Sequence, residues 1–482
     1  MPKGPRLNYI KRNFTTRDSL GIEGVMTSMS ADVCPIVTTV TPRAFYWPFM
    51  VWIYYDFYKY SGIVERTVTA FDTYLKRQDY FFVMATLLNT NSDRGNLVGI
   101  TQAEIDINEN PNGPYPYNPK YFKTKYGGMQ YYGAGCISMG FTIDSDPYTG
   151  KQFALPKLSK DGEKLALSFE NVIKDTEYYK NYRLNDEAVP RRVLEEYGQT
   201  INMGLSGFDK SKEMLRRRLF DNNYRLSECA RYIDYLYHNY QMLNLDRESA
   251  RMILFDHISQ DGMAIDIPVD LKEVANHWEI IIGRQYFTSG LEMIWKSMLL
   301  KIEDPATKGE WMERMLTRSE FEWNIEHTLD SVLDQCRFDN KQREELIRKG
   351  TKGNDIETNL ENGIKVMLSL YNWIKEKNDF GEEKALLKYG IDSHSVSFSE
   401  FADTVDEYKN KSIKSFMIFV MNNWLCDQHH FTAFEKLMQG RDGFYYELVD
   451  ERYTKKVDFT LAFQGIRLIQ LMQVMKDLDM LS

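Results

Sequence analysis

The sequence predicts a mainly α-helical protein, with an N-terminal α+β domain that is winged-helix-like and a C-terminal helical bundle. Three observations support this fold class. Apolar residues recur at helical spacing through the C-terminal part. An aromatic segment near the N-terminus has the length of a buried helix, and a short strand pair is expected between two helices further along. The change to continuous helical patterns predicts domains 1–182 and 183–482.

The first element of the N-terminal domain is the segment Arg43–Tyr60, RAFYWPFMVWIYYDFYKY. It is aromatic on every side, which predicts a helix that is buried on most faces. Pro48 is expected to kink this helix or to mark a second start. A further helix is predicted over residues 64–89. Arg43 and Arg284 both lie among apolar residues, so each guanidinium is expected to pair with a carboxylate or to stack on a ring.

The winged-helix-like segment follows a loop rich in proline and tyrosine. Residues 129–140 predict a short helix, and Phe141–Ile143 and Gln152–Leu155 predict strands around a turn. Ser159 is a candidate N-cap for the next helix, which has two acids in its first turn. Helix, strand, turn, strand and helix is the order of a winged helix-turn-helix from its third helix onward. That order fits DNA contact, but the reading helix is nearly uncharged, so docking to a protein stays an alternative.

From about residue 185 onward the chain predicts one helix after another. Each apolar stripe has the spacing of a helix that is amphipathic or buried, as in an α-bundle. Loops with glycine or proline separate the helices. The stripes lie within Tyr232–Leu243, Phe287–Leu299, Val366–Ile374, Phe416–Leu425 and Leu461–Leu478.

Charge, cysteine content and the length of the apolar runs exclude several classes of protein. The 482 residues carry a formal net charge of −9, so a protein that coats nucleic acid with its whole surface is excluded. The five cysteines are scattered and odd in number, which predicts buried reduced thiols and neither a disulfide framework nor a zinc site. Residues 44–55 form the most membrane-like run and fall far short of the roughly 20 apolar residues that span a bilayer. We therefore expect a cytoplasmic location and no membrane partner.

A basic segment is the first candidate site. Lys210, Lys212, Arg216, Arg217 and Arg218 stand close together and could contact the phosphates of a nucleic acid. The alternative is a solvated helix face that pairs with acidic neighbours, and the overall negative charge favours it. No phosphate-binding glycine loop accompanies the segment.

A polar cluster is the second candidate site. Cys426, Asp427, His429 and His430 are residue types that ligate metals or form nucleophile–base pairs. Adjacent histidines on a helix point about 100° apart, so His429 and His430 rarely share one ion. The favoured alternative is a helix end whose polar groups pair with neighbours. We expect no metal and no cofactor, and no catalytic residue is assigned.

Several short motifs resemble a pattern found in large, uncharacterised prokaryotic proteins encoded among antiviral defence genes. The motifs are scattered over most of the chain, and the resemblance implies a genomic and biological setting but carries over no catalytic residue. They are Leu20–Glu23, Cys34–Trp52, Arg284–Phe287 with Leu291, Glu292 and Trp295, and Trp424–Leu425 with Asp427, His429, Arg441 and Asp442.

These observations lead to one functional hypothesis and two alternatives. The leading hypothesis is a non-catalytic scaffold or regulatory subunit of a prokaryotic antiviral defence complex, working with a partner ATPase or nuclease. The first alternative is a divergent metal-dependent hydrolase or nuclease, which needs two or three converging acids. The second is a winged-helix regulator that binds DNA.

Overall fold

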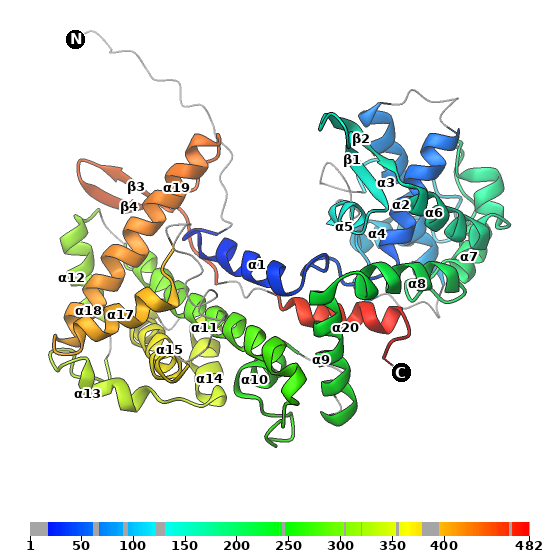
Figure 1. The fold of residues 1–482 in the computed structure, drawn as a ribbon. Coiled ribbons are helices and arrows are strands. Elements are labelled where there is room, and N and C mark those ends of the chain that lie inside the picture. The colour runs from blue at the N-terminus through cyan, green and yellow to red at the C-terminus, as the bar shows by residue number, and fades with distance from the viewer. Residues whose placement is uncertain are drawn as a thin grey trace, which may run out of the picture. The chain divides into compact units, whose positions relative to one another are not determined.

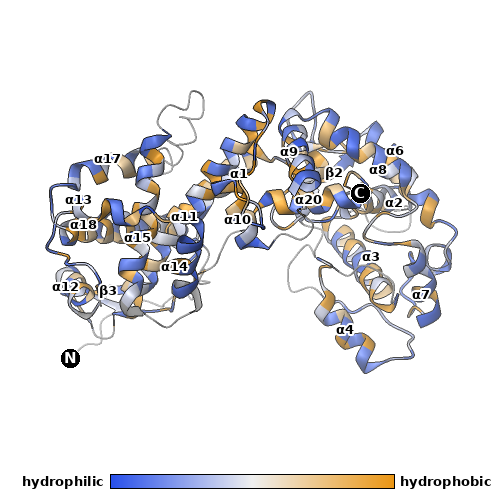
Figure 2. Ribbon diagram, turned by 90° about the horizontal axis from the view of Figure 1, so that it is seen from below, coloured by the Kyte–Doolittle hydropathy of each residue, from blue (hydrophilic) through white to orange (hydrophobic). Residues whose placement is uncertain are grey.

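The computed structural model shows a mainly helical protein, and the residues that it describes include two short antiparallel hairpins (Figure 1). The fold class is therefore confirmed at the level of a mainly α-helical chain. In Figure 2 blue and orange residues alternate along most helices, as expected of amphipathic helices with one buried face. The structure describes residues 18–60, 67–89, 95–121, 131–240, 242, 246–302, 305–319, 321–352, 356–377, 395–461 and 465–481.

The chain forms two compact units, and neither is continuous in sequence. Unit 1 comprises Met1–Val33 and Asn244–Gly465, and unit 2 comprises Cys34–Leu243 and Ile466–Ser482. The backbone therefore passes from one unit to the other three times. The domain boundary expected between residues 182 and 183 lies inside unit 2.

Unit 2 is built on the predicted aromatic helix. In its core α2 (Tyr46–Tyr60) packs on α6 (Lys160–Ile173), and α3 (Val68–Leu88) packs on α7 (Arg191–Thr200). Phe45 stacks on Phe82 with 4.5 Å between ring centroids. Pro48 falls in the first turn of α2, where proline is tolerated, so it marks the helix start. The helices are α2 (Tyr46–Tyr60), α3 (Val68–Leu88), α4 (Ile100–Glu109), α5 (Gly133–Ser138), α6 (Lys160–Ile173), α7 (Arg191–Thr200), α8 (Asp209–Arg216), α9 (Tyr224–Tyr240) and α20 (Arg467–Asp477), with π-helices η2 (Tyr178–Tyr182) and η3 (Arg217–Asp221).

The predicted hairpin lies between α5 and α6. Strand β1 (Thr142–Ser145) pairs antiparallel with β2 (Gln152–Leu158). Ser159 is the N-cap of α6, because its hydroxyl oxygen accepts a hydrogen bond of 3.0 Å from the Gly162 amide. The predicted order of helix, hairpin and helix is confirmed. The expected helix start at residue 129 lies outside the described residues.

Unit 1 is centred on two long helices, α11 (Lys272–Leu300) and α15 (Ile356–Glu376). Two glycines allow them to pack closely, since a Cβ on Gly363 would lie 2.6 Å from the carbonyl oxygen of Gly290. The elements are α1 (Ile22–Val33), α10 (Arg247–Asp256), η4 (Val269–Leu271), α11 (Lys272–Leu300), α12 (Lys308–Arg318), α13 (Asp330–Leu333), η5 (Asp334–Cys336), α14 (Asn340–Lys352), α15 (Ile356–Glu376), α17 (Phe398–Tyr408), α18 (Ile413–Phe419), η7 (Val420–Asp427), α19 (Gln428–Met438), β3 (Tyr446–Val449) and β4 (Arg452–Lys455).

The β3–β4 hairpin was not predicted. Three of the four residues in β3 are exposed, so this strand has no regular alternation of apolar and polar residues to reveal it. Among the described residues, no helix combines the length and the apolar character needed to cross a bilayer.

Both arginines that were expected to pair or stack do so. The Nε of Arg43 lies 2.9 Å from a carboxylate oxygen of Asp477. The guanidinium of Arg284 lies 5.2 Å from the ring centroid of Phe287 and donates hydrogen bonds to Val396 and Ser395. All five cysteines are buried and none forms a disulfide, as predicted.

Candidate functional site

The basic segment is largely occupied by contacts within unit 2. Lys212 is buried, and its Nζ lies 2.6 Å from a carboxylate oxygen of Asp479. The Nε of Arg216 donates a 2.7 Å hydrogen bond to the carbonyl oxygen of Leu478. These two cations therefore hold the chain that follows α20 against α8.

The other three cations of this segment have different surroundings. Arg218 pairs with Asp161 in the first turn of α6, whereas Lys210 and Arg217 are exposed. The structure therefore does not present the five residues as one uniform cationic surface. Lys210 and Arg217 are the two best placed to meet a phosphate.

The polar cluster of unit 1 does not converge on one point. Cys426 is buried, and burial raises the pKa of its thiol to about 12. The carboxylate of Asp427 lies 3.1 Å from the Nζ of Lys308. His430 is exposed, with its ring 5.5 Å from that of Phe444.

His429 is fully buried, and both of its ring nitrogens form hydrogen bonds with backbone groups. Its Nδ1 lies 2.9 Å from the carbonyl oxygen of Ser19, and its Nε2 accepts a 3.3 Å hydrogen bond from the Tyr445 amide. This pattern fixes the neutral tautomer with the proton on Nδ1. Burial lowers the pKa of His429 to about 4. Within the described ranges, no three His, Cys, Asp or Glu side chains are grouped so as to hold a metal ion.

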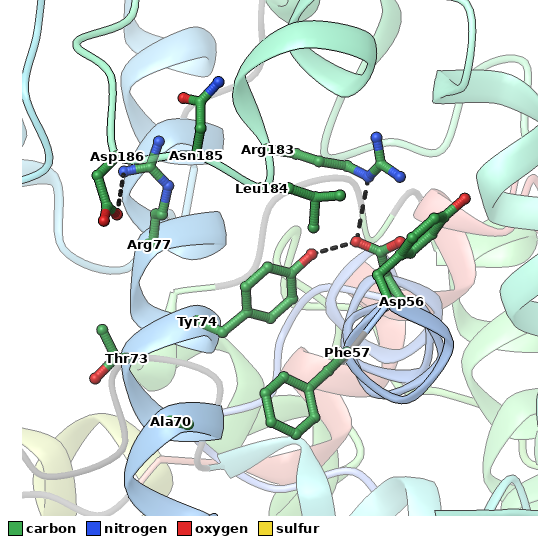
Figure 3. Close-up of a pocket in the computed structure, with 11 residues that line it drawn as sticks. Asp56, Phe57, Ala70, Thr73, Tyr74, Arg77, Arg183, Leu184, Asn185 and Asp186 are labelled. Atoms are coloured by element: carbon green, nitrogen blue, oxygen red, sulfur yellow. Dashed lines mark hydrogen bonds and ion pairs between the residues drawn. The ribbon is translucent and has the colours of Figure 1, made fainter. Parts of the chain in front are cut away.

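A cavity in unit 2 brings charged and aromatic side chains together (Figure 3). Its volume is about 320 Å³, at the lower end of the range for pockets that bind small molecules. Helices α2 and α3 supply most of the wall, and the segment after η2 supplies the rest. The lining residues are Asp56, Phe57, Tyr60, Ala70, Thr73, Tyr74, Arg77, Arg183, Leu184, Asn185 and Asp186.

Asp56 is the buried acid of this cavity. Figure 3 shows the hydroxyl of Tyr74 and the guanidinium of Arg183 directed at the same oxygen, Oδ2, with the Arg183 Nε at 3.3 Å. The second oxygen, Oδ1, is also buried and has no hydrogen-bond partner among the described residues. Burial raises the pKa of Asp56, and the charge of Glu170 adds to the rise, while Arg183 and Tyr74 oppose it.

A widened helical turn holds Arg183 in place. The π-helix η2 ends at Tyr182, and the guanidinium of Arg183 lies 3.7 Å from the Tyr179 ring centroid and 4.6 Å from that of Tyr60. It also donates a hydrogen bond to the carbonyl oxygen of Tyr179. Single turns of π-helix occur often at functional sites, where they re-aim a side chain.

Arg77 is the second buried cation of the cavity. Its Nη2 donates a 3.1 Å hydrogen bond to the carbonyl oxygen of Tyr182, and its guanidinium lies 4.9 Å from the Phe81 ring centroid. The exposed carboxylate of Asp186 lies 4.0 Å from its Nη1. The buried Nε has no acceptor in the described part of the chain.

Neither of the candidate sites predicted from the sequence includes these residues. Asp56, Arg77 and Arg183 belong to no recognisable sequence motif. The available signal was an isolated acid within an otherwise aromatic helix, since a buried charge in such a place needs a partner. No family model, curated protein or solved structure matches the chain.

Proposed function

We propose that this chain is a non-catalytic scaffold or regulatory subunit of a prokaryotic antiviral defence complex, working with a partner ATPase or nuclease. The biological setting rests on the motif resemblance described above. The observation that supports a partner-binding role is an exposed apolar face on α19.

Two large apolar side chains dominate this face. Phe434 and Met438 are 52% and 74% exposed and stand four residues apart, so they are neighbours on one side of the helix. Phe431, 38% exposed, extends the same side by one turn. The opposite side carries His429 and Ala433 into the core of unit 1. A helix with a buried face and a second apolar face suits docking into an apolar groove of a partner.

Affinity purification of the chain from its native host, at moderate salt and followed by mass spectrometry, tests the proposal. An ATPase or nuclease is expected to co-purify in stoichiometric amount. The double replacement Phe434→Ser and Met438→Ser is expected to reduce its recovery at least about tenfold, because each buried apolar anchor contributes about 1–3 kcal/mol.

The matched control is Met263→Ser with Val269→Ser, since both side chains are exposed and apolar and lie on other elements of unit 1. This control is expected to leave recovery unchanged. Purification of the chain alone would contradict the proposal, as would hydrolysis of ATP or nucleic acid by the purified chain without a partner.

A DNA-binding regulator is the second candidate function. The β1–β2 hairpin supports it, because it lies between two helices as the wing of a winged-helix domain does. Lys151 and Lys157 are exposed on this hairpin, and Tyr148 at its tip is 96% exposed. The short helix α5 carries no charged residue, so backbone contact by the wing is the expected mode.

For this candidate, neutralising the hairpin is expected to change the salt dependence of DNA affinity. Lys151→Gln with Lys157→Gln removes two phosphate contacts and should reduce the slope of log K against log salt by about 2. Lys174→Gln with Lys180→Gln, two exposed lysines after α6, is the control. Equal slopes for the hairpin variant and the wild type would contradict wing contact.

A further inference from the structure

We infer that the cavity beside Asp56 binds a small zwitterion of the amino-acid type, with its carboxylate on Arg77, its ammonium on Asp56 and its apolar body against the aromatic wall. This ligand site goes beyond the partner role proposed for α19. The α19 surface lies in unit 1 and the cavity lies in unit 2.

The ligand carboxylate is assigned to Arg77. A buried guanidinium is costly unless carboxylates or carbonyls satisfy its five donors. Arg77 has a backbone carbonyl on Nη2 and an exposed carboxylate at 4.0 Å, and its Nε has no acceptor among the described residues. A ligand carboxylate would supply the missing acceptor and bind through the planar fork that suits this pairing.

The ligand ammonium, which donates hydrogen bonds, is assigned to Asp56. An ionised carboxylate accepts about four hydrogen bonds, and both of the donors found here reach Oδ2. Oδ1 is buried without a partner in the described structure. An ammonium group carries three donors and a positive charge, so it satisfies Oδ1 and compensates the buried acid.

Charge balance selects a zwitterion over a simple anion or cation. The cavity lining already contains two acids and two arginines. A phosphate or plain carboxylate would place a net negative charge near the fully buried Asp56, and a plain amine would place a net positive charge near two arginines. A ligand with both charges keeps the site neutral.

The wall and the size fit the rest of such a ligand. Phe57, Tyr74 and Leu184 supply apolar surface, and the rings of Tyr60 and Tyr74 can also face an ammonium. The volume of about 320 Å³ suits a ligand of amino-acid size and is too small for a dinucleotide.

Isothermal titration calorimetry on the full chain, with matched ligand series, tests this inference. Phenylalanine is compared with 3-phenylpropionate and phenethylamine, and leucine with 4-methylpentanoate and isoamylamine. At least one of the two amino acids is expected to bind, and each of its analogues about tenfold more weakly, because each lacks one charged contact. The inference is overturned if neither amino acid binds, or if an analogue binds as tightly as its parent.

Variants locate the binding in this cavity. Asp56→Asn keeps the shape but removes the charge, so it should weaken the amino acid about tenfold and leave 3-phenylpropionate or 4-methylpentanoate unweakened. Asp175→Asn, at an exposed carboxylate of unit 2 that does not line the cavity, is the control and should change affinity little. Equal affinity of Asp56→Asn and wild type for the amino acid would place the site elsewhere. If Asp56→Asn fails to fold, the analogue series on the wild type still decides the ligand class.

Discussion

Replacing Asp477 by asparagine is expected to destabilise unit 2 by about 3 kcal/mol, because it leaves a buried arginine without its carboxylate. The Arg43 side chain is 1% exposed, and its Nε lies 2.9 Å from Asp477. The same carboxylate oxygen accepts a 3.0 Å hydrogen bond from the Ala44 amide, just before α2. Urea unfolding followed by hydrogen exchange on α2 and α20 measures the loss.

Two further variants make this result specific. Asp175→Asn removes a carboxylate whose side chain is 82% exposed and whose partner Lys180 is 54% exposed, so it should cost less than about 1 kcal/mol. The double variant Arg43→Met with Asp477→Leu should recover most of the loss, because no charge is then left buried. A cost for Asp477→Asn no larger than that for Asp175→Asn would show that the Arg43 pair does not stabilise unit 2.

The stability of unit 1 is expected to fall by about 3 kcal/mol between pH 6.5 and pH 4 through His429 alone. Burial lowers the pKa of its imidazole from 6.5 to about 4 in the folded state. In this window the unfolded chain binds a proton at His429 and the folded chain does not, so acid favours unfolding. Above pH 6.5 both states are neutral at this residue and the contribution is constant.

His429→Asn isolates this effect. The amide can still donate toward the Ser19 carbonyl, but it does not titrate, so the variant is less stable at pH 7 and lacks this part of the pH dependence. The difference in unfolding free energy between wild type and variant should shrink by about 3 kcal/mol from pH 7 to pH 4. His430→Asn, at the exposed neighbour, is the control. A difference independent of pH would contradict the buried neutral imidazole.

The sequence predicted those elements that depend on local patterns. The aromatic segment gave α2, and Ser159 gave the N-cap of α6, because burial on all faces and capping both follow from neighbouring residues. The partners of Arg43 and Arg284 could be predicted only by type, since nothing local identifies Asp477 or the Phe287 ring.

The candidate sites depend on contacts between distant residues. The bond between Arg183 and Asp56 joins positions 127 residues apart, and that between His429 and Ser19 joins positions 410 apart. Helical periodicity shows that a face is buried but not what covers it. For this reason the sequence does not reveal the cavity, and it cannot show that both ring nitrogens of His429 are hydrogen-bonded to the backbone.

The interleaved connectivity has a consequence for biosynthesis. Helix α20 packs on α9, and its Arg467 donates a 3.1 Å hydrogen bond to the carbonyl oxygen of Cys34. At about 5–20 residues per second, a ribosome needs on the order of tens of seconds to pass from Tyr240, the end of α9, to Asp477. Throughout that time the apolar surface awaiting α20 has no covering helix. Nascent chains are therefore expected to need a chaperone over this interval.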